Sequence, residues 1–509
     1  MSPMRSIVTH RRVLLAGASS LVAVVPMLVS LGASGAAGAT AVTISAGALG
    51  LNVAPWDGQY AASSAGSALD KDLEQAGITQ LRYGGGDTAD EYDWQTNTGL
   101  SQCSSTALNL YTSGCATHEA LDFSLFAQNA QEIGAQSLMT VNYGSGTPAE
   151  AAAWVRQAKN TAGESAARWE IGNETYGCWE DNNELAAAPE SYQGYVANKS
   201  GDCPMVATSA TVGMQTMAES YAENAKLFMT AMKAANPNAD IGVPWAFDYT
   251  VYGASVVDNN QWNDTVLGLD ARDIGFVDAH WYPLGFGGTT GGDNPTDQTV
   301  LNSLFEIPSE YAKIQSALSQ YDPTAKIVVG ETGVTFRATT IPCTPVGALF
   351  SAGDALQWLA AGAQSVDWWT MNTGSNKDTT CVNPDEGMFV GATTLVPDSY
   401  YTGYQLASSL VKPNAQLSTL TTSDPANVLA YQSVLPDGKT AIAFINTNTA
   451  DPEDVSFTSS ESGDLAEQSY SAADQNASDT YIVSTETTAA SLANGITLPA
   501  ESITVLTED

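Results

Sequence analysis

Residues 168–177 read RWEIGNETYG, and the order of residue types in this stretch decides how the rest of the chain is interpreted. The stretch begins like a strand and ends in small and polar residues, which predicts that Asn173 and Glu174 lie where a strand passes into a loop. Residues 326–333, KIVVGETG, repeat this order: a β-branched run, a glycine and then Glu331. Each of the two carboxylates is therefore expected at the end of a buried strand.

Two carboxyl groups brought together at strand ends are what glycoside hydrolysis requires. One is protonated and gives its proton to the leaving oxygen, while the other is ionised and attacks the sugar or activates water. Two other interpretations of the first motif are a surface dipeptide and a glycosylation site, because Asn173 starts an Asn-x-Thr sequon. Both fit poorly, since Trp169 and Tyr176 imply a half-buried setting. We therefore take Glu174 and Glu331 as the candidate catalytic pair.

From about residue 42 to residue 373, short β-branched or apolar runs alternate with longer alanine-rich segments, which is the rhythm of repeated βα units. The strand candidates are residues 42–52, 80–83, 136–142, 168–171, 241–245, 276–280, 327–330 and 365–370. The helix candidates between them include residues 149–159, 217–234, 308–319 and 346–361. This order predicts an α/β fold, a (β/α)8 TIM barrel with its site at the C-terminal strand ends, so that Glu174 follows the fourth strand and Glu331 the seventh.

After roughly residue 400 the pattern changes to short runs separated by Asp-Gly, Asn, Ser and Pro turns. This pattern is typical of an antiparallel β-sandwich, whose first strands could include part of the segment before the barrel. The strand candidates are residues 429–434, 440–445, 454–457, 480–484 and 502–506. The predicted domains are a signal peptide at 1–39, a catalytic barrel at 40–395 and a C-terminal sandwich at 396–509.

The first residues have the features of an export signal. Three arginines precede an apolar run at residues 13–37 that contains no acidic residue, and Ala37-Gly38-Ala39 is a suitable signal-peptidase site. The pair Arg11-Arg12 also suits a twin-arginine signal. The alternative is an uncleaved membrane anchor. We expect a secreted, extracellular protein that begins near Thr40 and has no membrane association after cleavage.

The charge balance is strongly acidic, with 55 acidic against 18 basic residues and a formal net charge of −37. Nucleic acids and anionic membranes would be repelled by such a surface, so neither is expected as a partner. Charged residues make up only 14% of the chain. A surface wetted mainly by uncharged polar groups suits an acidic environment, where carboxylates lose their charge.

Six cysteines in an exported chain indicate disulfides. Their order along the chain favours three local pairs: Cys103 with Cys115, Cys178 with Cys203, and Cys343 with Cys381. Six cysteines allow fifteen connectivities, so the pairing itself is a hypothesis. A cysteine metal centre is disfavoured because the chain lacks the Cys-x-x-Cys spacing, and neither a metal nor another cofactor is expected.

Several polar residues at predicted strand ends could orient the carboxylates or a substrate. Arg82, in the sequence LRYGGGD after the second strand, is expected to keep Glu331 ionised. His280 could orient a carboxylate or a sugar hydroxyl, and Tyr282 could hydrogen-bond Glu331. Asn52, at the end of the first strand, joins this group, as does Asn173. The triple glycine after Arg82 lacks the Gly-Lys-Ser/Thr of a phosphate loop and is better suited to close approach of a sugar.

Tryptophans near predicted strand ends could stack on the faces of sugar rings. Seven fall in such positions: Trp56, Trp94, Trp179, Trp245, Trp281, Trp368 and Trp369. Of these, Trp179, Trp281 and Trp369 are the candidate substrate-binding residues. We expect Trp154, Trp169 and Trp358 to belong to the core.

Two further elements carry a resemblance to a known family. Residues 82–86, RYGGG, and residues 141–155, VNYGSGTPAEAAAWV, resemble the Arg-(Phe/Tyr)-Pro-Gly-Gly and Asn-Phe-Gly-(Ser/Thr)-Gly-Thr-x-x-Glu-Ala-x-x-Trp-Val elements of the family 51 α-L-arabinofuranosidases. With the two Glu motifs they follow the order of that family through much of the barrel. The chain departs from the pattern at Gly84, which replaces a proline, and in the loop at 176–179 with its insertion at 181–203.

The resemblance implies a clan A glycoside hydrolase that retains anomeric configuration by double displacement. It implies that Glu174 is the acid/base and Glu331 the nucleophile, with carboxyl groups roughly 5–5.5 Å apart. It also implies roles around the −1 sugar for Arg82, Asn173, His280 and Tyr282.

The sequence thus predicts a secreted retaining α-L-arabinofuranosidase acting on plant or cell-wall polysaccharide side chains, with an oligo- or polysaccharide as its partner. The alternatives within the clan are a β-xylosidase, β-glucuronidase, β-galactofuranosidase or endo-glucanase. Outside enzymes, they are a non-catalytic carbohydrate-binding protein and, more remotely, an adhesin that works through its C-terminal domain. The sugar, the linkage, exo or endo action and the oligomeric state are left open.

Overall fold

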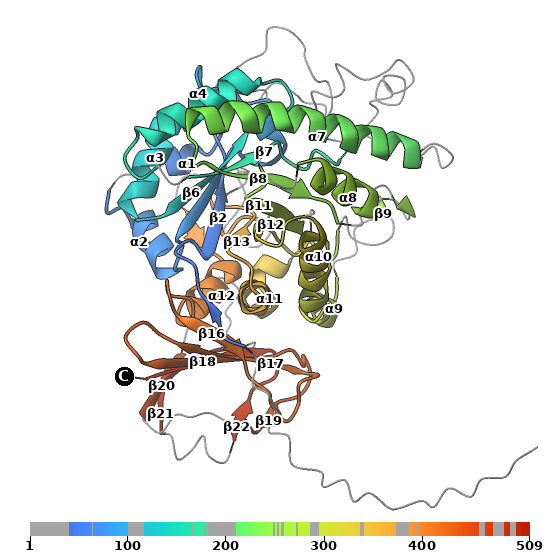
Figure 1. Cartoon of the computed structure of the whole chain (residues 1–509). Helices are drawn as coiled ribbons and strands as arrows, with labels where there is room; N and C mark the ends of the chain where they lie inside the picture. The colour runs from blue at the N-terminus through green and yellow to red at the C-terminus, as the bar shows by residue number, and fades with distance from the viewer. Residues whose placement is uncertain are drawn as a thin grey trace, which may run out of the picture. The chain divides into compact units, whose positions relative to one another are not determined.

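The computed structural model of the chain is shown in Figure 1. Residues 39–509 form one compact unit, and none of the described helices is long and apolar enough to cross a membrane. The proposed export signal, Trp179 and every cysteine except Cys343 lie outside the described residues, so the signal and the three disulfide pairs stay predictions. The structure describes residues 40–63, 65–99, 117–164, 167–177, 180, 210–247, 250–251, 254–255, 259–270, 273–285, 295–335, 340–372, 386–391, 395–457, 464–471, 483–488 and 495–508.

A closed barrel of eight parallel strands forms the centre of the fold (Figure 1). All eight predicted strands are present, and the predicted barrel is confirmed. The boundaries of the other seven agree within two residues. The first candidate was wrong: a turn at residues 46–47 divides it, so that Val42–Thr43 is a separate strand, β1, outside the barrel. The barrel strands in chain order are β2 (Leu49–Val53), β3 (Gln80–Tyr83), β6 (Gln136–Val141), β7 (Arg168–Ile171), β8 (Asp240–Trp245), β11 (Phe276–Trp281), β12 (Lys326–Thr332) and β13 (Val366–Trp368).

Helices surround the barrel and follow from local sequence signals. The helix α4 (Pro148–Lys159) begins after the N-cap Thr147, whose side chain accepts from the Glu150 N–H, and it has Pro148 in its first turn and Lys159 in its last. The other main helices are α2 (Ala68–Gln75), α3 (Phe123–Glu132), α7 (Ala210–Ala235), α8 (Asn259–Asp270), α9 (Asp297–Ser303), α10 (Ile307–Tyr321), α11 (Pro345–Ala361) and α12 (Ser399–Ala407). Short turns of helix are α1 (Gly58–Ala61), η1 (Gly86–Asp90) and η4 (Ile341–Cys343).

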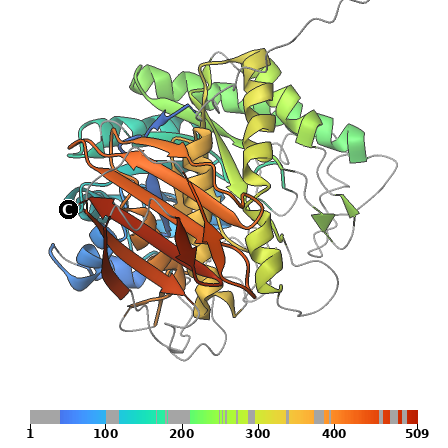
Figure 2. The same ribbon diagram turned by 90° about the horizontal axis from the view of Figure 1, so that it is seen from below.

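The C-terminal region is a seven-stranded antiparallel sheet, shown from below in Figure 2. One face packs into the same apolar core as the barrel helices. The other face is covered by the two-stranded β19/β22 sheet, with Phe444 and Val455 in the small core between them. This arrangement bears out the predicted sandwich. The sheet runs β1 (Val42–Thr43), β16 (Gln416–Thr419), β17 (Val428–Val434), β18 (Thr440–Asn446), β23 (Ser502–Glu508), β20 (Asp464–Ser471) and β21 (Val483–Thr488), with β19 (Glu453–Val455) and β22 (Ile496–Leu498) opposite.

The helix α11 lies between the barrel and this sheet. Its sequence, PVGALFSAGDALQWLAA, is apolar or small almost throughout, and fifteen of its seventeen residues are buried. It packs against β13 on one side and against β16 and β23 on another, while α12 runs beside it. A helix buried all round is expected to carry such a sequence. The helix α12 lies after the predicted domain boundary between residues 395 and 396 and packs against α11. The boundary itself stays a prediction.

Several carboxyl groups outside the candidate pair are buried, among them Asp57, Glu164, Asp354 and Asp367. Burial raises the pKa of Asp57 to about 6, the pKa of Glu164 and of Asp367 to about 7, and the pKa of Asp354 to about 8. In the unfolded chain the same groups titrate near pH ~4. Between these values the folded chain holds protons that the unfolded chain has released.

The protein is therefore expected to be more stable at pH 5 than at pH 8. The stabilisation is fully present below pH ~4 and is lost as the pH rises through the folded pKa values of about 6 to 8. We expect the melting temperature to fall by on the order of 5 °C from pH 5 to pH 8 in calorimetry at constant ionic strength. Asp354→Asn keeps an oxygen for the Thr332 hydroxyl, which donates to Asp354 over 3.0 Å, and should weaken the dependence. A melting temperature that rises with pH would contradict this account.

Candidate active site

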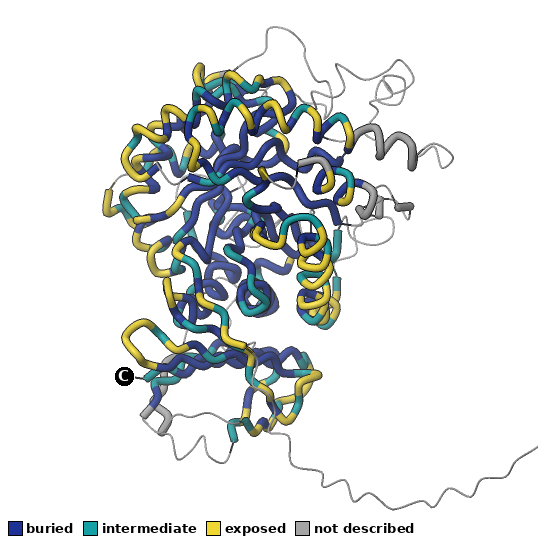
Figure 3. Tube along the Cα trace, viewed as in Figure 1, coloured by how far each residue is buried: buried dark blue, intermediate teal, exposed yellow. Residues whose placement is uncertain are grey.

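Five barrel strands bring the candidate residues to one end of the barrel. The register of β11 against β12 pairs His280 with Glu331, and the register of β2 against β3 pairs Asn52 with Arg82. Glu174 follows β7 in the loop. All of these residues are buried. Figure 3 shows in dark blue how the buried positions of the chain gather in the barrel. Strand order and register alone therefore gather residues that are up to 279 positions apart, from Asn52 to Glu331 (331 − 52 = 279).

His280 bridges the two carboxylates. Its Nδ1 lies 3.0 Å from Glu174 Oε1 and 3.5 Å from Glu331 Oε2. One oxygen of Glu174, one of Glu331 and one ring nitrogen of His280 all lie within 4.8 Å of one another. Burial lowers the pKa of His280, but the charge of Glu331 and the hydrogen bond to Glu174 outweigh it and raise that pKa to about 9. The two acids on either side therefore favour the protonated form of the ring.

Three side chains contact the carboxylate of Glu331: His280, Arg82 and Tyr282. Arg82 Nη1 donates to its Oε1 over 2.7 Å, and the Tyr282 hydroxyl donates to its Oε2 over 3.0 Å. Burial raises the pKa of Glu331, while the charges of His280 and Arg82 oppose that rise. The contacts that the sequence predicted for Arg82 and Tyr282 are thus present, and they fix the carboxylate in one orientation.

Arg82 is wholly buried, and all the N–H groups of its guanidinium donate to protein acceptors. Its Nη2 lies 2.7 Å from Glu170 Oε2, and its Nε lies 3.3 Å from the same oxygen and 3.6 Å from Asp278 Oδ2. The remaining three N–H groups go to the oxygens of Glu331 (2.7 Å), Asn52 (2.9 Å) and Asn173 (2.9 Å). A guanidinium has five N–H donors. Because all five are engaged, Arg82 orients its neighbours and has no donor left for a substrate.

Glu174 adopts a backbone conformation that is unusual for its residue type. Its φ is 41°, in the left-handed region, and Gly172, two residues before it, has φ 74°. A side chain at such φ values costs on the order of 1 kcal/mol or more and persists where surrounding contacts fix it. Here the Tyr176 hydroxyl donates to Glu174 Oε1 over 3.0 Å, on the oxygen that His280 also contacts. The carboxyl group is only 6% exposed and is aimed at His280.

The fold of the chain is similar to the folds of several enzymes of known structure. An α-L-arabinofuranosidase from Thermotoga maritima in complex with arabinose matches with TM-score 0.64 and 16% identity, over 92% of this chain and 98% of that one. The chain has the family 51 arabinofuranosidase fold. The family 51 arabinofuranosidase of Xanthomonas axonopodis pv. citri matches with TM-score 0.62 and 15% identity over 92% and 98%. A family 44 endoglucanase from Clostridium thermocellum matches with TM-score 0.58 and 14% identity over 92% and 98%. No protein-family model and no curated protein sequence matches the chain.

Within this family 51 fold, the predicted aromatic residues take different positions. Trp281 is buried between the rings of Phe247 and Trp358, with centroid distances of 5.4 and 5.9 Å, which leaves it little surface for a sugar. Trp369 is partly exposed, and a Cβ on Gly86 would lie 2.7 Å from its ring. Trp369 is therefore the candidate sugar platform in the described part of the chain. The tryptophans predicted for the core, Trp154, Trp169 and Trp358, are all buried.

Asn52 is fully engaged by the protein. Its Oδ1 accepts from Arg82 over 2.9 Å, and its Nδ2 donates to the Gly330 carbonyl over 2.8 Å. It is completely buried. Asn52 therefore belongs to the framework that positions Arg82 and the strand of Glu331. Its contact with a sugar stays a prediction.

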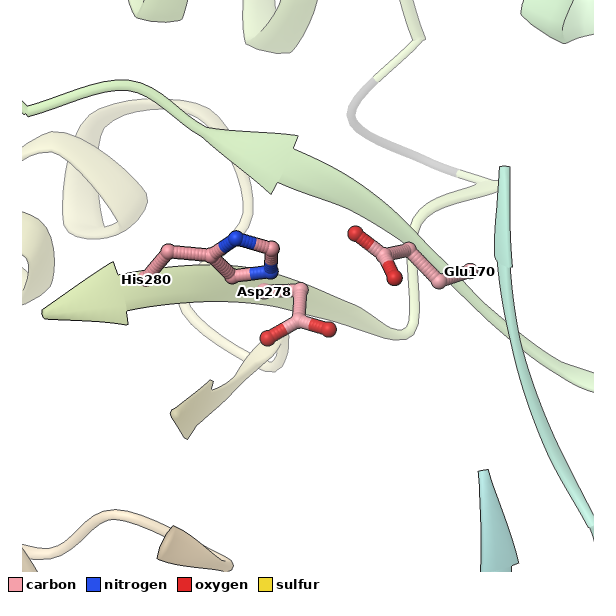
Figure 4. A group of neighbouring side chains, drawn as sticks. All are labelled: Glu170, Asp278 and His280. Carbon is pink, nitrogen blue, oxygen red and sulfur yellow. The ribbon is translucent and has the colours of Figure 1, made fainter. Parts of the chain in front are cut away.

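Sequence reasoning missed two acids beneath the site in this family 51 fold, Glu170 and Asp278. Figure 4 shows both beside His280: Asp278 and His280 come from β11, and Glu170 comes from β7, with β8 between the two strands in the barrel. One ligand atom from each lies within 4.8 Å of the others, a spacing that suits a metal ion. The Arg82 guanidinium already supplies a cation there, 2.7 Å from Glu170 and 3.3 Å from His280 Nε2. The sequence did contain a signal for both acids, because each is a charged residue within a predicted strand.

Gly330 is required by the close approach of Asp278. The Gly330 N–H donates to Asp278 Oδ1 over 2.6 Å, and a Cβ at this position would lie 2.2 Å from both carboxylate oxygens. We expect Gly330→Ala to displace Asp278 and the adjacent Glu331, lowering stability by about 2–3 kcal/mol and kcat by at least tenfold.

The matched control is Gly268→Ala in α8, where a Cβ would meet only Tyr321 at 3.6 Å and no loss is expected. Chemical denaturation of both variants, with kinetics on the folded fraction, makes the comparison. If Gly330→Ala behaved like Gly268→Ala, the steric account would be wrong.

Proposed function

We propose that the protein is a secreted retaining glycoside hydrolase and, specifically, an α-L-arabinofuranosidase acting on polysaccharide side chains. The observation that carries the proposal is the buried pair of Glu174 and Glu331, with oxygens within 4.8 Å of each other and joined through His280. Inverting enzymes keep their carboxyl groups roughly 6.5–9.5 Å apart to admit a water, whereas retaining enzymes bring them to roughly 5–5.5 Å. The short separation therefore supports direct attack by one carboxylate.

In the proposed mechanism Glu331 attacks the anomeric carbon and Glu174 gives its proton to the leaving oxygen. The bond to the leaving group breaks as the bond to Glu331 forms. Glu174, now a carboxylate, then takes a proton from water, whose oxygen displaces Glu331 from the sugar. Arg82 and Tyr282 hold Glu331 in the attacking orientation and disperse its charge when it leaves.

The arabinofuranose assignment is supported by the motif resemblance and by the fold shared with family 51 enzymes. A second candidate is an endo-β-glucanase, because the family 44 endoglucanase matches over the same share of this chain with TM-score 0.58. A bifunctional glucanase-xylanase also matches, with TM-score 0.60 and 14% identity. The two candidates differ in the sugar and linkage that they cleave, so activity on defined substrates decides between them.

The test is hydrolysis at pH 4 to 5 of aryl glycosides of α-L-arabinofuranose, β-D-xylose, β-D-glucose, β-D-glucuronic acid and β-D-galactofuranose, beside β-glucan and xyloglucan polymers. Release from the arabinofuranoside, lost in Glu331→Gln, is the expected result. Release from another sugar or only from a polymer would move the substrate and keep the mechanism. Inactivity on every substrate, with binding to a polysaccharide, would replace the proposal by a non-catalytic carbohydrate-binding protein.

A further inference from the structure

The side chain of Asn173 is held at both ends. Its Oδ1 accepts from Arg82 Nη2 over 2.9 Å, and its Nδ2 donates to Glu180 Oε1 over 2.9 Å. A guanidinium only donates hydrogen bonds, so the amide oxygen must face Arg82 and the amide nitrogen must face Glu180. The orientation of the carboxamide is thus set by its two partners.

The main chain of Asn173 is fixed separately from its side chain. The Asn173 N–H donates to Asp90 Oδ2 over 3.0 Å, and Asp90 Oδ1 accepts from the Tyr143 N–H over 3.0 Å. Gly172 and Glu174, on either side, both have positive φ. Because Asp90 holds this turn, loss of Glu180 would leave the carboxamide held at one end only, by Arg82, without releasing the backbone that carries Glu174.

Glu180 is buried among other acids. Only 2% of it is exposed, and its N–H donates to the Gly177 carbonyl over 3.3 Å, which keeps it against the loop of Glu174. Burial raises the pKa of Glu180 well above its ordinary value, and the carboxylates of Asp87, Asp90 and Glu174 raise it further. A neutral acid keeps its acceptor oxygen for Asn173 and places no full negative charge beside Glu174.

We propose that Glu180 is a positioning residue that fixes the Asn173 carboxamide beside Glu174 for one orientation of substrate. The inference rests on the proposed function, in which a sugar lies between Glu174 and Glu331. The amide nitrogen of Asn173 carries two hydrogens, and one of them goes to Glu180. The second hydrogen is the donor for a sugar hydroxyl. A rotated carboxamide would present its oxygen in place of that donor and lose the contact with Arg82.

Two substitutions separate positioning from charge. Glu180→Gln keeps an oxygen that accepts from Asn173, whereas Glu180→Met has similar length and no acceptor. We expect kcat/KM to stay within about threefold of wild type in the Gln variant and to fall roughly 10- to 100-fold in the Met variant, mainly through kcat. In the Asn173→Ala background the Met substitution should cost less than about twofold, because its effect passes through Asn173.

A control and a second readout complete the test. Glu164→Met removes another buried carboxyl group, which accepts from the Ser137 hydroxyl over 2.9 Å, and reports the effect of losing buried polarity alone. Crystal structures of the two Glu180 variants should show the carboxamide turned away from Arg82 only in the Met variant. An unmoved carboxamide in that variant, or costs of Glu180→Met and Asn173→Ala that multiply, would overturn the inference. A wild-type protein inactive on every glycoside would defeat the proposed function instead, while the structures still decide the positioning role.

Discussion

Glu331→Gln is expected to lower kcat by on the order of 10⁴-fold or more with little change in stability. The amide cannot attack the anomeric carbon, yet it is close in size to the carboxylate: its oxygen can still accept from Arg82, and its nitrogen can donate to the Tyr282 hydroxyl. Glu174→Gln should lower kcat by roughly 10²- to 10⁴-fold on substrates whose leaving group needs a proton. Steady-state kinetics on an active substrate, with circular dichroism to show that each variant is folded, makes the measurement.

Azide separates the two roles. With Glu331→Ala, azide can take the vacated position of the nucleophile, and the glycosyl azide should have the opposite anomeric configuration to the substrate. With Glu174→Ala, azide attacks the covalent intermediate that Glu331 still forms, and the product should keep the substrate configuration. The same product configuration from both variants would contradict the assignment, and near-normal turnover in either variant would remove that residue from the chemistry.

Arg82→Met is expected to destabilise the fold by about 3–5 kcal/mol and to abolish measurable activity. Without the guanidinium, Glu170, Asp278 and Glu331 would be left close together in the barrel interior with only the His280 ring to balance their charge. Burial and mutual repulsion would then raise the pKa of Glu331, and the nucleophile would be neutral over most of the working range. Denaturant titration and a pH–rate profile measure the two effects.

The control is Arg168→Met, because Arg168 pairs with Asp240 at 3.7 Å at a more exposed position. Such pairs contribute about 1 kcal/mol or less, so the two substitutions should differ by several kcal/mol. Arg82→Lys restores the charge but only part of the five-donor arrangement, and should recover more stability than activity. Equal losses for Arg82→Met and Arg168→Met would show that the three carboxylates do not depend on Arg82.

The barrel could be predicted because its strands are buried on both faces and appear as continuous apolar runs. The strand at Gln80–Tyr83 matches its prediction at both ends. The prediction of the C-terminal sheet was less complete, because it did not include β20 or β22. The strand β20 (DLAEQSYS) is polar along much of its length, and β22 has only three residues. Neither segment has the alternation or length by which a strand is recognised from sequence.

A site residue could be predicted where it belongs to a recognisable local sequence motif. Glu174 and Glu331 each end a strand-like run, and Arg82 stands out because it precedes a triple glycine. Glu180 gave no comparable signal, because its importance comes from one amide hydrogen bond and from three acids that the fold brings near it. Such a role depends on burial and distance between segments, which spacing along the chain does not reveal.

The buried helix α11 has a consequence for how the whole chain folds. The same apolar core includes Trp358 from this helix, Val329 from the barrel and Tyr431 and Val505 from the C-terminal sheet. Residues Val42–Thr43, from before the barrel, pair with β16 and so close the sheet with the opposite end of the chain. We therefore expect barrel and sheet to unfold in one cooperative transition, because neither part keeps a complete apolar interior without the other. A truncation that removes the sheet would expose the apolar face of the helix that both parts share.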